Sequence, residues 1–210
     1  MRLLLARHGR TASNVAALLD TAPPGPDLDD LGRAQAEVLA TRLAGHRVDA
    51  VYSSDLVRAV QTAAPAVRSF GVAHREIPGL REISAGDDEM SPDVLRYLTA
   101  LRAWGEGDHS VRIPGGEDGV EFLARYGAAI RQIAEAGHET VLVVSHGAAI
   151  RTWAGFVMPV VHRHLGHGGM PNTTVIVADG DPDAGWTLRG IDFPASDPQD
   201  GFAALGDRRG

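Results

Sequence analysis

Near its start the chain reads Leu3-Leu4-Leu5-Ala6-Arg7-His8-Gly9, and much later it reads Val141-Leu142-Val143-Val144-Ser145-His146-Gly147. Each stretch is a short apolar run that ends close to a His-Gly pair. Runs of this kind are typical of strands that are buried on both faces of a parallel sheet. Because ligands bind beyond the carboxyl ends of the strands in such sheets, we expect both histidines at the edge where a functional site forms.

The remaining sequence alternates strand-like and helix-like patterns, which predicts a three-layer α/β/α sandwich around a central, mostly parallel sheet. We expect strands at residues 2–6, 50–53, 74–77, 141–145 and 173–178, with a hairpin partner at 186–191. Helices are expected at about 30–44, from about 56 onward, at about 91–104 and at about 117–136.

Local signals refine these helices. Asp55 should be the N-cap of the second helix, Pro65 should kink or end that helix, and Ser91 should be the N-cap of the third. Apolar residues at helical spacing predict which side chains face the core: Leu31, Ala34, Val38 and Leu43 in the first helix, Val60, Ala63, Ala64 and Val67 in the second, and Val120, Leu123, Ile130 and Ile133 in the fourth.

The composition is that of an ordinary soluble globular protein, with 44% apolar and 22% charged residues among 210. This length suits one α/β domain. A net charge of −7 predicts no general attraction to nucleic acid or to acidic membranes. No apolar run approaches the roughly 20 residues that span a bilayer. We therefore expect a cytoplasmic protein with neither partner. The sequence does not define the oligomeric state, and a homodimer is compatible with it.

Cysteine and lysine are both missing, which excludes several kinds of chemistry. Without cysteine, disulfides, thiolate catalysis and cysteine-bound metals are excluded. Without lysine, Walker-type phosphate loops and Schiff-base catalysis are excluded. All 20 basic residues are therefore arginine, so an arginine at any single position is weak evidence of function by itself.

His8 is the candidate nucleophile. A neutral imidazole can attack phosphorus and so divide a difficult hydrolysis into two easier steps. Neighbouring arginines should lower the pKa of His8 and keep it unprotonated before substrate binds. Taken alone, His8 could equally be a histidine that caps backbone groups at the end of a strand.

Arg7, Arg58 and His146 are the candidate phosphate-binding residues. A guanidinium matches phosphate oxygens bidentately, and Arg58 should lie in the first turn of a helix, where the helix dipole favours anions. His146 could stabilise transition-state charge as an imidazolium, while Gly147 would allow close approach of a ligand. The simpler interpretation is a solvated Arg58 and a packed His146.

Glu82 is the candidate general acid, which would protonate the leaving alkoxide and then activate water. That role requires a raised pKa, so we expect partial burial. Asp87, Asp88 and Glu89 lie close by and could serve instead.

Two further sets of polar residues suggest ligand contacts. Thr11 and Asn14 could donate hydrogen bonds to phosphate, although both residue types are also common helix caps. His162, His164 and His167 have the spacing of a metal site, but the Gly- and Pro-containing segment that follows lacks the rigidity such a site needs. We therefore expect neither a metal nor a cofactor.

Together these residues resemble the histidine phosphatase superfamily, the group that includes phosphoglycerate mutases. The matching motifs occur in the family's order and cover the chain to about residue 190: Arg7-His8-Gly9-x-Thr11-x-x-Asn14, Gly32-x-x-Gln35-Ala36, Ser53-Ser54-Asp55-x-x-Arg58-Ala59-x-Gln61-Thr62-Ala63, Leu80-x-Glu82, Pro114-Gly115-Gly116-Glu117, Ser145-His146-Gly147 and Asn172.

The resemblance implies a phosphorylated His8, a phosphate pocket of Arg7, Arg58 and His146, and Glu82 as proton donor. It implies supporting contacts from Thr11 and Asn14 and no requirement for metal. We expect one catalytic domain over residues 1–194, in which residues 83–116 form a cap that sets specificity, and a mobile tail at 195–210.

The chain departs from the family's pattern near the site. Arg10 stands where many relatives carry an acid, and so adds a cation that could contact substrate. The segment Gly86-Asp87-Asp88-Glu89-Met90 replaces a frequent Gly-x-Trp-Glu-Gly. The Glu-Arg-x-Tyr-Gly segment and the long insertion with paired arginines, both features of glycolytic mutases, are missing.

The sequence therefore favours a metal-independent phosphomonoesterase that acts on a small phosphorylated metabolite through phospho-His8. A phosphoglycerate mutase or phosphotransferase is the alternative, because it differs only in what accepts the phosphoryl group. A phosphate-binding scaffold without turnover is a third reading. Arg10 and Arg112 would favour an anionic substrate.

Overall fold

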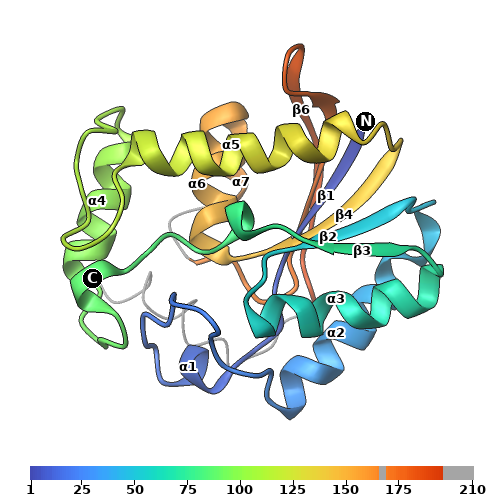
Figure 1. Cartoon of the computed structure of the whole chain (residues 1–210), viewed down its shortest axis with the longest axis horizontal. Coiled ribbons are helices and arrows are strands. Elements are labelled where there is room, and N and C mark those ends of the chain that lie inside the picture. Colours follow the sequence, from blue (N-terminus) through green and yellow to red (C-terminus); the bar gives the residue numbers. More distant parts are fainter. Residues whose placement is uncertain (166–168, 196–210) are drawn as a thin grey trace.

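The computed structural model describes residues 1–165 and 169–195, which form an α/β fold around one sheet (Figure 1). The strand order in this part of the chain is β3-β2-β4-β1-β5-β6. Pairing of β1 with β4, of β4 with β2 and of β2 with β3 is parallel, whereas β5 and β6 are antiparallel additions at one edge. The strands are β1 Arg2–Arg7, β2 Ala50–Ser53, β3 Ala73–Glu76, β4 Thr140–Ser145, β5 Val175–Asp181 and β6 Gly185–Asp192. This sheet confirms the predicted mostly parallel arrangement.

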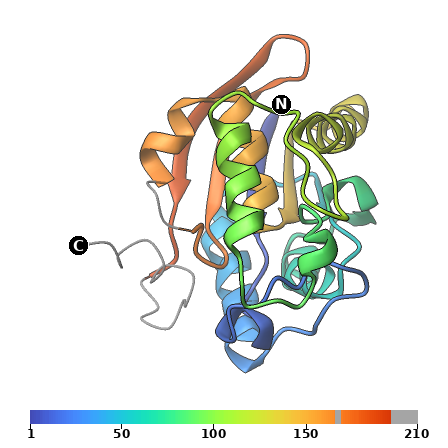
Figure 2. The same cartoon turned by 90° about the vertical axis from the view of Figure 1, so that its left-hand side faces the viewer.

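Helices cover both faces of the sheet, as the predicted three layers require. In Figure 1, α2 and α3 lie on one side and α5, α6 and α7 on the other, and Figure 2 shows α4 alongside α6. The helices of the described residues are α1 Ala12–Val15, α2 Asp30–Arg42, α3 Val57–Phe70, α4 Leu95–Gly105, α5 Gly119–Glu135, α6 Gly147–Val157 and α7 Val160–Leu165, with short 3₁₀ turns at Leu43–Gly45, Pro78–Leu80 and Gly86–Asp88.

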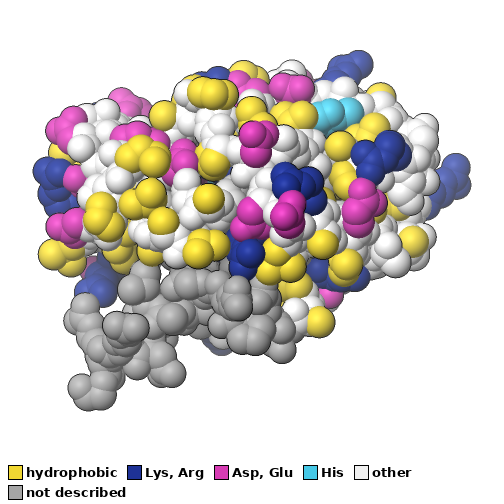
Figure 3. Space-filling model, turned by 90° about the horizontal axis from the view of Figure 1, so that it is seen from below, with side chains coloured by type: hydrophobic (Ala, Val, Ile, Leu, Met, Phe, Trp, Pro, Cys, Tyr) yellow, Lys and Arg dark blue, Asp and Glu magenta, His cyan; other side chains and the backbone are white. Residues whose placement is uncertain are grey.

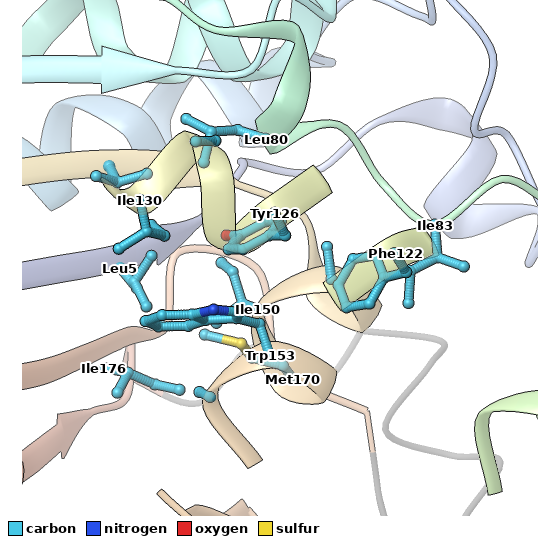
Figure 4. Packing of buried hydrophobic residues seen from close by; sticks show 14 of the residues in the cluster. Leu5, Leu80, Ile83, Phe122, Tyr126, Ile130, Ile150, Trp153, Met170 and Ile176 are labelled. Carbon is cyan, nitrogen blue, oxygen red and sulfur yellow. The ribbon is translucent and has the colours of Figure 1, made fainter. Parts of the chain in front are cut away.

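Two apolar cores result from the alternation of side chains along the strands. Leu3 and Leu5 of β1 join the core beneath α4, α5 and α6, whereas Leu4 and Ala6 point into the core beneath α2 and α3. Figure 4 shows part of the first core, where side chains from β1, α5, α6 and β5 surround Trp153. Because both faces of β1 are covered, the strand is apolar throughout, as its sequence indicated.

The parallel register positions the functional edge of the sheet. Arg7 pairs with Ser145 at the ends of β1 and β4, and Ser53 of β2 pairs with Val144. The residues that follow these three strands therefore leave the sheet at the same edge, His8 level with His146 and Ser54 one residue before that level.

The structure corrects the predicted buried face of α2. Val38 is 54% exposed and Ala34 is also exposed, whereas Gly32, Ala36, Leu39 and Ala40 are buried. Both sets have helical spacing, so periodicity alone could not choose between them. The observed face is selected by Gly32, which lies against the backbone of Arg10: a Cβ at Gly32 would be 2.0 Å from that carbonyl oxygen.

The starts of the other helices also differ from the prediction. Leu56, not Asp55, is the N-cap of α3, because the Asp55 carboxylate pairs with Arg81. Helix α4 begins at Leu95, since the Ser91 hydroxyl accepts a hydrogen bond from the Asp93 N–H instead of capping a helix. Asp118 caps α5 in a capping box with Glu121.

Side-chain burial in α3 and α5 also differs in part. Pro65 lies inside α3 without ending it, and the buried face of α3 contains Arg58 and Thr62 in addition to the predicted Ala63. Val60, Ala64 and Val67 are only partly buried. In α5, Val120 is 61% exposed because the helix turns its Phe122 and Tyr126 toward the core. The polar burial in α3 is the first indication that this helix serves a site.

The described residues contain no helix of the length and apolar character needed to cross a bilayer. The predicted tail falls almost entirely at residues 196–210, outside the described part of the chain. On the face drawn in Figure 3, acidic and basic side chains of the described residues are interspersed, and no large area carries one charge.

Two glycine substitutions test the close contact between α2 and the loop after His8. Gly32→Ala should lower the free energy of unfolding by about 1–3 kcal/mol, because the added Cβ must displace the backbone of Arg10. Gly127→Ala, in α5, adds a Cβ that meets no atom within 4 Å, and should raise it by about 0.5–1 kcal/mol. Urea unfolding measures both. If both variants changed the free energy of unfolding equally and with the same sign, the close contact between Gly32 and Arg10 would be contradicted.

Candidate active site

His8 follows β1 and is held in one orientation by hydrogen bonds. Its side chain is buried, and Nδ1 lies 2.7 Å from the carbonyl oxygen of Gly9. A carbonyl can only accept, so Nδ1 carries the proton and Nε2 presents a lone pair. The Asn172 amide donates to the carbonyl oxygen of His8 at 2.8 Å, and the Thr62 hydroxyl accepts from the Gly9 N–H at 2.9 Å. The imidazole is thus prepared for attack through Nε2.

Arg58 reaches His8 from the first turn of α3. Its Nε lies 3.2 Å from His8 Nε2, and its Nη2 donates to the Asp20 carbonyl oxygen at 3.0 Å. The buried Nη1 has no hydrogen-bond partner within residues 1–165 and 169–195. Burial lowers the pKa of His8 well below 6.5, and the charges of Arg58 and Arg7 lower it further. The predicted direction of this shift is confirmed, although burial contributes more than the arginines.

His146 caps α6 beside His8, with ring centroids 5.2 Å apart. Its Nε2 lies 2.7 Å from the Ser54 hydroxyl, which itself accepts from the Leu56 N–H at 3.1 Å. A hydroxyl has two acceptor positions and one proton, so Ser54 can either donate to Nε2 or accept from it, and in the first case Nδ1 carries the imidazole proton. The buried Nδ1 has no hydrogen-bond partner in the described part of the chain.

Burial determines the charge that is favoured for His146 in the protein without ligand, and its role as an imidazolium in the transition state stays a prediction. Complete burial lowers the pKa of His146 well below 6.5, and Arg58 and His8 add to this effect. In the protein without ligand it is therefore neutral, not an imidazolium. A bound phosphate dianion would raise the pKa of His146.

Arg7 lies against the start of α6, where Gly147 is required. The Arg7 guanidinium donates to the Met170 carbonyl oxygen, and the side chain is buried. A Cβ on Gly147 would lie 3.2 Å from both Cδ and Nε of Arg7. Gly147 thus lets the guanidinium pass close to the amide end of the helix.

Glu82 is half-buried and turned toward the same helix end. Its carboxylate accepts hydrogen bonds from the N–H groups of Ala149 at 2.7 Å and Ala148 at 3.1 Å. Burial raises the pKa of Glu82, against the opposing effects of these amides and of the Arg58 charge. The expectation of partial burial and a raised pKa is confirmed.

The three other acids of this segment have different surroundings. Asp88 pairs with Arg96, and Asp87 is exposed. Glu89 accepts hydrogen bonds from Thr21 and from the Ala22 N–H, and so holds the loop whose Asp20 carbonyl contacts Arg58. Glu82 is the acid of this segment whose pKa is raised, and it lies at the start of α6 within reach of the Arg58 charge.

The supporting residues predicted around His8 are placed mainly as backbone caps. Thr11 and Asn14 form the capping box of α1, and Asn14 also accepts a hydrogen bond from Asn172 at 3.2 Å. Arg10 donates through Nε to Asp29 at 2.8 Å, while its N–H donates to Gln35. Contacts of Thr11, Asn14 and Arg10 with substrate stay predictions.

The histidines with the spacing of a metal site are not part of the candidate active site. His162 and His164 belong to α7, and His164 Nδ1 donates to the Val160 carbonyl oxygen at 2.9 Å. His167 is outside the described residues. Within the described residues, no group of three or more His, Asp or Glu side chains is arranged to hold a metal ion.

The arrangement of two histidines, two arginines and one glutamate agrees with a family match over nearly the whole chain. A model of the histidine phosphatase superfamily (branch 1) matches residues 3–192. The chain belongs to this superfamily.

The proteins similar to this member of the superfamily include both mutase-like proteins and phosphatases. It is 37% identical to the PE-PGRS family protein PE_PGRS11 of Mycobacterium tuberculosis, over 87% of this chain but only 35% of that protein. It is 33% identical to the "Probable phosphoglycerate mutase GpmB" of Proteus mirabilis, over 71% of each. A solved mycobacterial glucosyl-3-phosphoglycerate phosphatase superimposes with a TM-score of 0.73 at 27% identity, covering 90% of this chain and 96% of that one.

Sequence analysis assigned no role to Ser54, Asn172 or Thr62, and considered Glu89 only as an alternative general acid, but all four organise the candidate site. Ser54 holds Nε2 of His146, Asn172 and Thr62 hold the loop around His8, and Glu89 holds the loop next to Arg58. A signal for Ser54 was available: it follows a buried strand, as His8 and His146 do. No comparable signal marks Glu89, whose partner Thr21 is 68 residues away.

The depressed pKa values of His8 and His146 predict how stability depends on pH. In the unfolded chain both titrate near 6.5, whereas in the folded protein they stay neutral at lower pH. Their stabilising contribution is therefore complete above pH 6.5 and is lost as pH falls below it. Each should cost about 1 kcal/mol per pH unit below that point.

The measurement is urea unfolding at several pH values between about 7.5 and about 5.5, a range that spans the histidine pKa of the unfolded chain. The difference between the wild type and a His8→Asn, His146→Asn double variant isolates the two groups. His46→Asn, in the loop after α2, is the matched control and should follow the wild type. Equal slopes for the wild type and the double variant would contradict the burial of neutral imidazoles.

Proposed function

We propose that this protein hydrolyses small phosphomonoesters without a metal, through a phosphoryl group carried on His8. The observation that supports this most is the tautomer of His8, because Nδ1 is committed to the Gly9 carbonyl and Nε2 faces Arg58. Arg58 Nη1 is a buried donor with no partner in the described residues, and His146 Nδ1 is a second buried nitrogen without one; with its proton on Nδ1, His146 would also donate to a phosphoryl oxygen.

In the first step, the substrate phosphoryl group takes the place of His8 in the contact with Arg58. His8 Nε2 attacks phosphorus, and the bond between phosphorus and the ester oxygen breaks. Glu82 gives its proton to the departing alkoxide, which leaves as an alcohol. The imidazolium that forms keeps its Nδ1–H on the Gly9 carbonyl, which stabilises the positive charge.

In the second step, water attacks phospho-His8. Glu82, now ionised, takes a proton from the water, the N–P bond breaks, and inorganic phosphate forms. His8 returns to its neutral Nδ1–H tautomer. A raised pKa suits both roles of Glu82, since it must hold a proton in one step and accept one in the next.

A phosphoglycerate mutase is the second candidate, supported by the likeness to GpmB of Proteus mirabilis. It would share the first step, and differ in returning the phosphoryl group to a bound hydroxyl instead of to water. The likeness to a mycobacterial glucosyl-3-phosphoglycerate phosphatase supports hydrolysis. A scaffold without turnover is the least supported, because a mere phosphate-binding site has no need for a histidine with an unprotonated Nε2 and a neighbouring acid of raised pKa.

Phosphate release from an aryl phosphate with EDTA present tests the proposal. His8→Ala should lower kcat by roughly a thousandfold or more, because no other group in the site replaces the nucleophile. His46→Ala is the matched control and should keep wild-type activity. Substantial release by His8→Ala in a clean preparation would contradict the mechanism, and a wild type that transfers phosphate between phosphoglycerates without releasing it would favour the mutase.

The role of Glu82 is tested by its dependence on the leaving group. Glu82→Gln should slow alkyl phosphates by roughly a hundredfold or more and aryl phosphates far less, since only the former need protonation. Asp87→Asn, an exposed acid of the same segment, should change neither. Equal slowing of both substrate types by Glu82→Gln would instead indicate a structural role in capping α6.

A further inference from the structure

A pocket of about 570 Å³ opens beside Glu82 and is placed to receive the leaving group of a substrate. Its wall includes Thr21 and Pro23 of the loop near Arg58, and Arg81, Glu117, Glu121 and Arg125 on the side of α5. We call it the leaving-group pocket. Glu82 belongs both to this wall and to the phosphate site, so a phosphoester with phosphorus at His8 would extend its alcohol portion here.

Each guanidinium in the wall of the leaving-group pocket is already matched by a carboxylate. Arg81 binds Asp55 through two nitrogens. Arg125 binds both oxygens of Glu117, at 3.0 and 2.6 Å, and its Nη1 donates to the carbonyl oxygens of Gly79 and Arg81. The described wall therefore presents no uncompensated positive charge.

The acids of the wall still have hydrogen-bonding capacity toward a ligand. Glu117 and Glu121 are each paired with one arginine, but a carboxylate has about four acceptor positions. Glu82 adds a third carboxyl group, and the Ser84 hydroxyl is also in the wall. Such a surface accepts hydrogen bonds from hydroxyl groups, whereas a second anion would be repelled by the carboxylates and would find no free cation.

We infer that the leaving-group pocket takes an uncharged, hydroxyl-rich alcohol, such as a sugar or another polyol, in preference to one that bears a carboxylate. This inference rests on the proposed function. It replaces the expectation of an anionic substrate, since Arg112 binds Asp118 and Glu121, and Arg10 binds Asp29. Their charges are compensated within the protein.

Two substrates that differ in one group provide the test. Glycerol 3-phosphate and 3-phosphoglycerate share a three-carbon skeleton, and a hydroxymethyl group in the first replaces the carboxylate of the second. The wild type should show a kcat/KM for glycerol 3-phosphate about tenfold or more above that for 3-phosphoglycerate. Equal values, or a preference for 3-phosphoglycerate, would overturn the inference.

Hydrolysis of an aryl phosphate separates this inference from the proposed function. If the aryl phosphate is hydrolysed in a His8-dependent way while 3-phosphoglycerate is preferred, the inference alone fails. If the aryl phosphate is not hydrolysed, both fail. Hydrolysis together with a preference for glycerol 3-phosphate supports both.

Charge-removing variants test the cause of the preference. Glu117→Gln releases Arg125 from its ion pair, whereas Glu121→Gln removes a carboxylate from the pocket wall and leaves Arg112 paired with Asp118. Each should shift the ratio of the two kcat/KM values several-fold toward 3-phosphoglycerate. Glu135→Gln, at the far end of α5, is the matched control and should leave the ratio unchanged. If neither pocket variant moves the ratio, the charge argument is overturned. Glu121 is exposed, so its variant should fold even if Glu117→Gln does not.

Discussion

The parallel pairing of β1 with β4 is the constraint on which the rest of the site depends. Its register sets Arg7 against Ser145, so the next residue of each strand is a histidine, and the two rings lie 5.2 Å apart. Pairing of β2 on the other side of β4 brings Ser54 to the same edge of the sheet, where its hydroxyl lies 2.7 Å from His146 Nε2. A shift of one residue in either pairing would turn these side chains to the opposite face. Burial of both faces of β1 and β4 by apolar side chains holds the register.

The site is built from buried donors, and its electrostatics follow from that. Both imidazoles are kept neutral chiefly by burial, and each has one nitrogen committed to a fixed partner, Gly9 for His8 and Ser54 for His146. Arg58 brings a positive charge to His8. Its other hydrogen bond is donated to the Asp20 carbonyl oxygen. The Arg58 charge lowers the pKa of Glu82, but the burial of Glu82 raises it by more. A phosphoryl dianion would accept a hydrogen bond from the buried Arg58 Nη1, which has no partner in the described residues, and this suits the site to transfer of phosphate.

Much of the fold and the central site could be predicted from sequence, because strand ends are marked by abrupt changes from apolar to polar residues. Arg7, His8 and His146 follow such ends, and Arg58 follows a third strand by one helical turn. Helix faces were harder: Val38 and Leu39 both belong to plausible apolar stripes, and only contact between Gly32 and Arg10 selects the one that is buried. The neutral state of His146 and the role of Glu89 depend on burial and on partners distant in sequence, which no local pattern encodes.

The most direct test of the central claim is to look for the phosphoryl group on His8 during turnover. Rapid quenching of the protein with a phosphomonoester, followed by mass spectrometry of the intact chain and of its peptides at alkaline pH, would locate it. The account predicts one acid-labile phosphoryl group per chain, on the peptide that contains His8. Steady release of phosphate with no phosphorylated protein, or with the group on another residue, would contradict it.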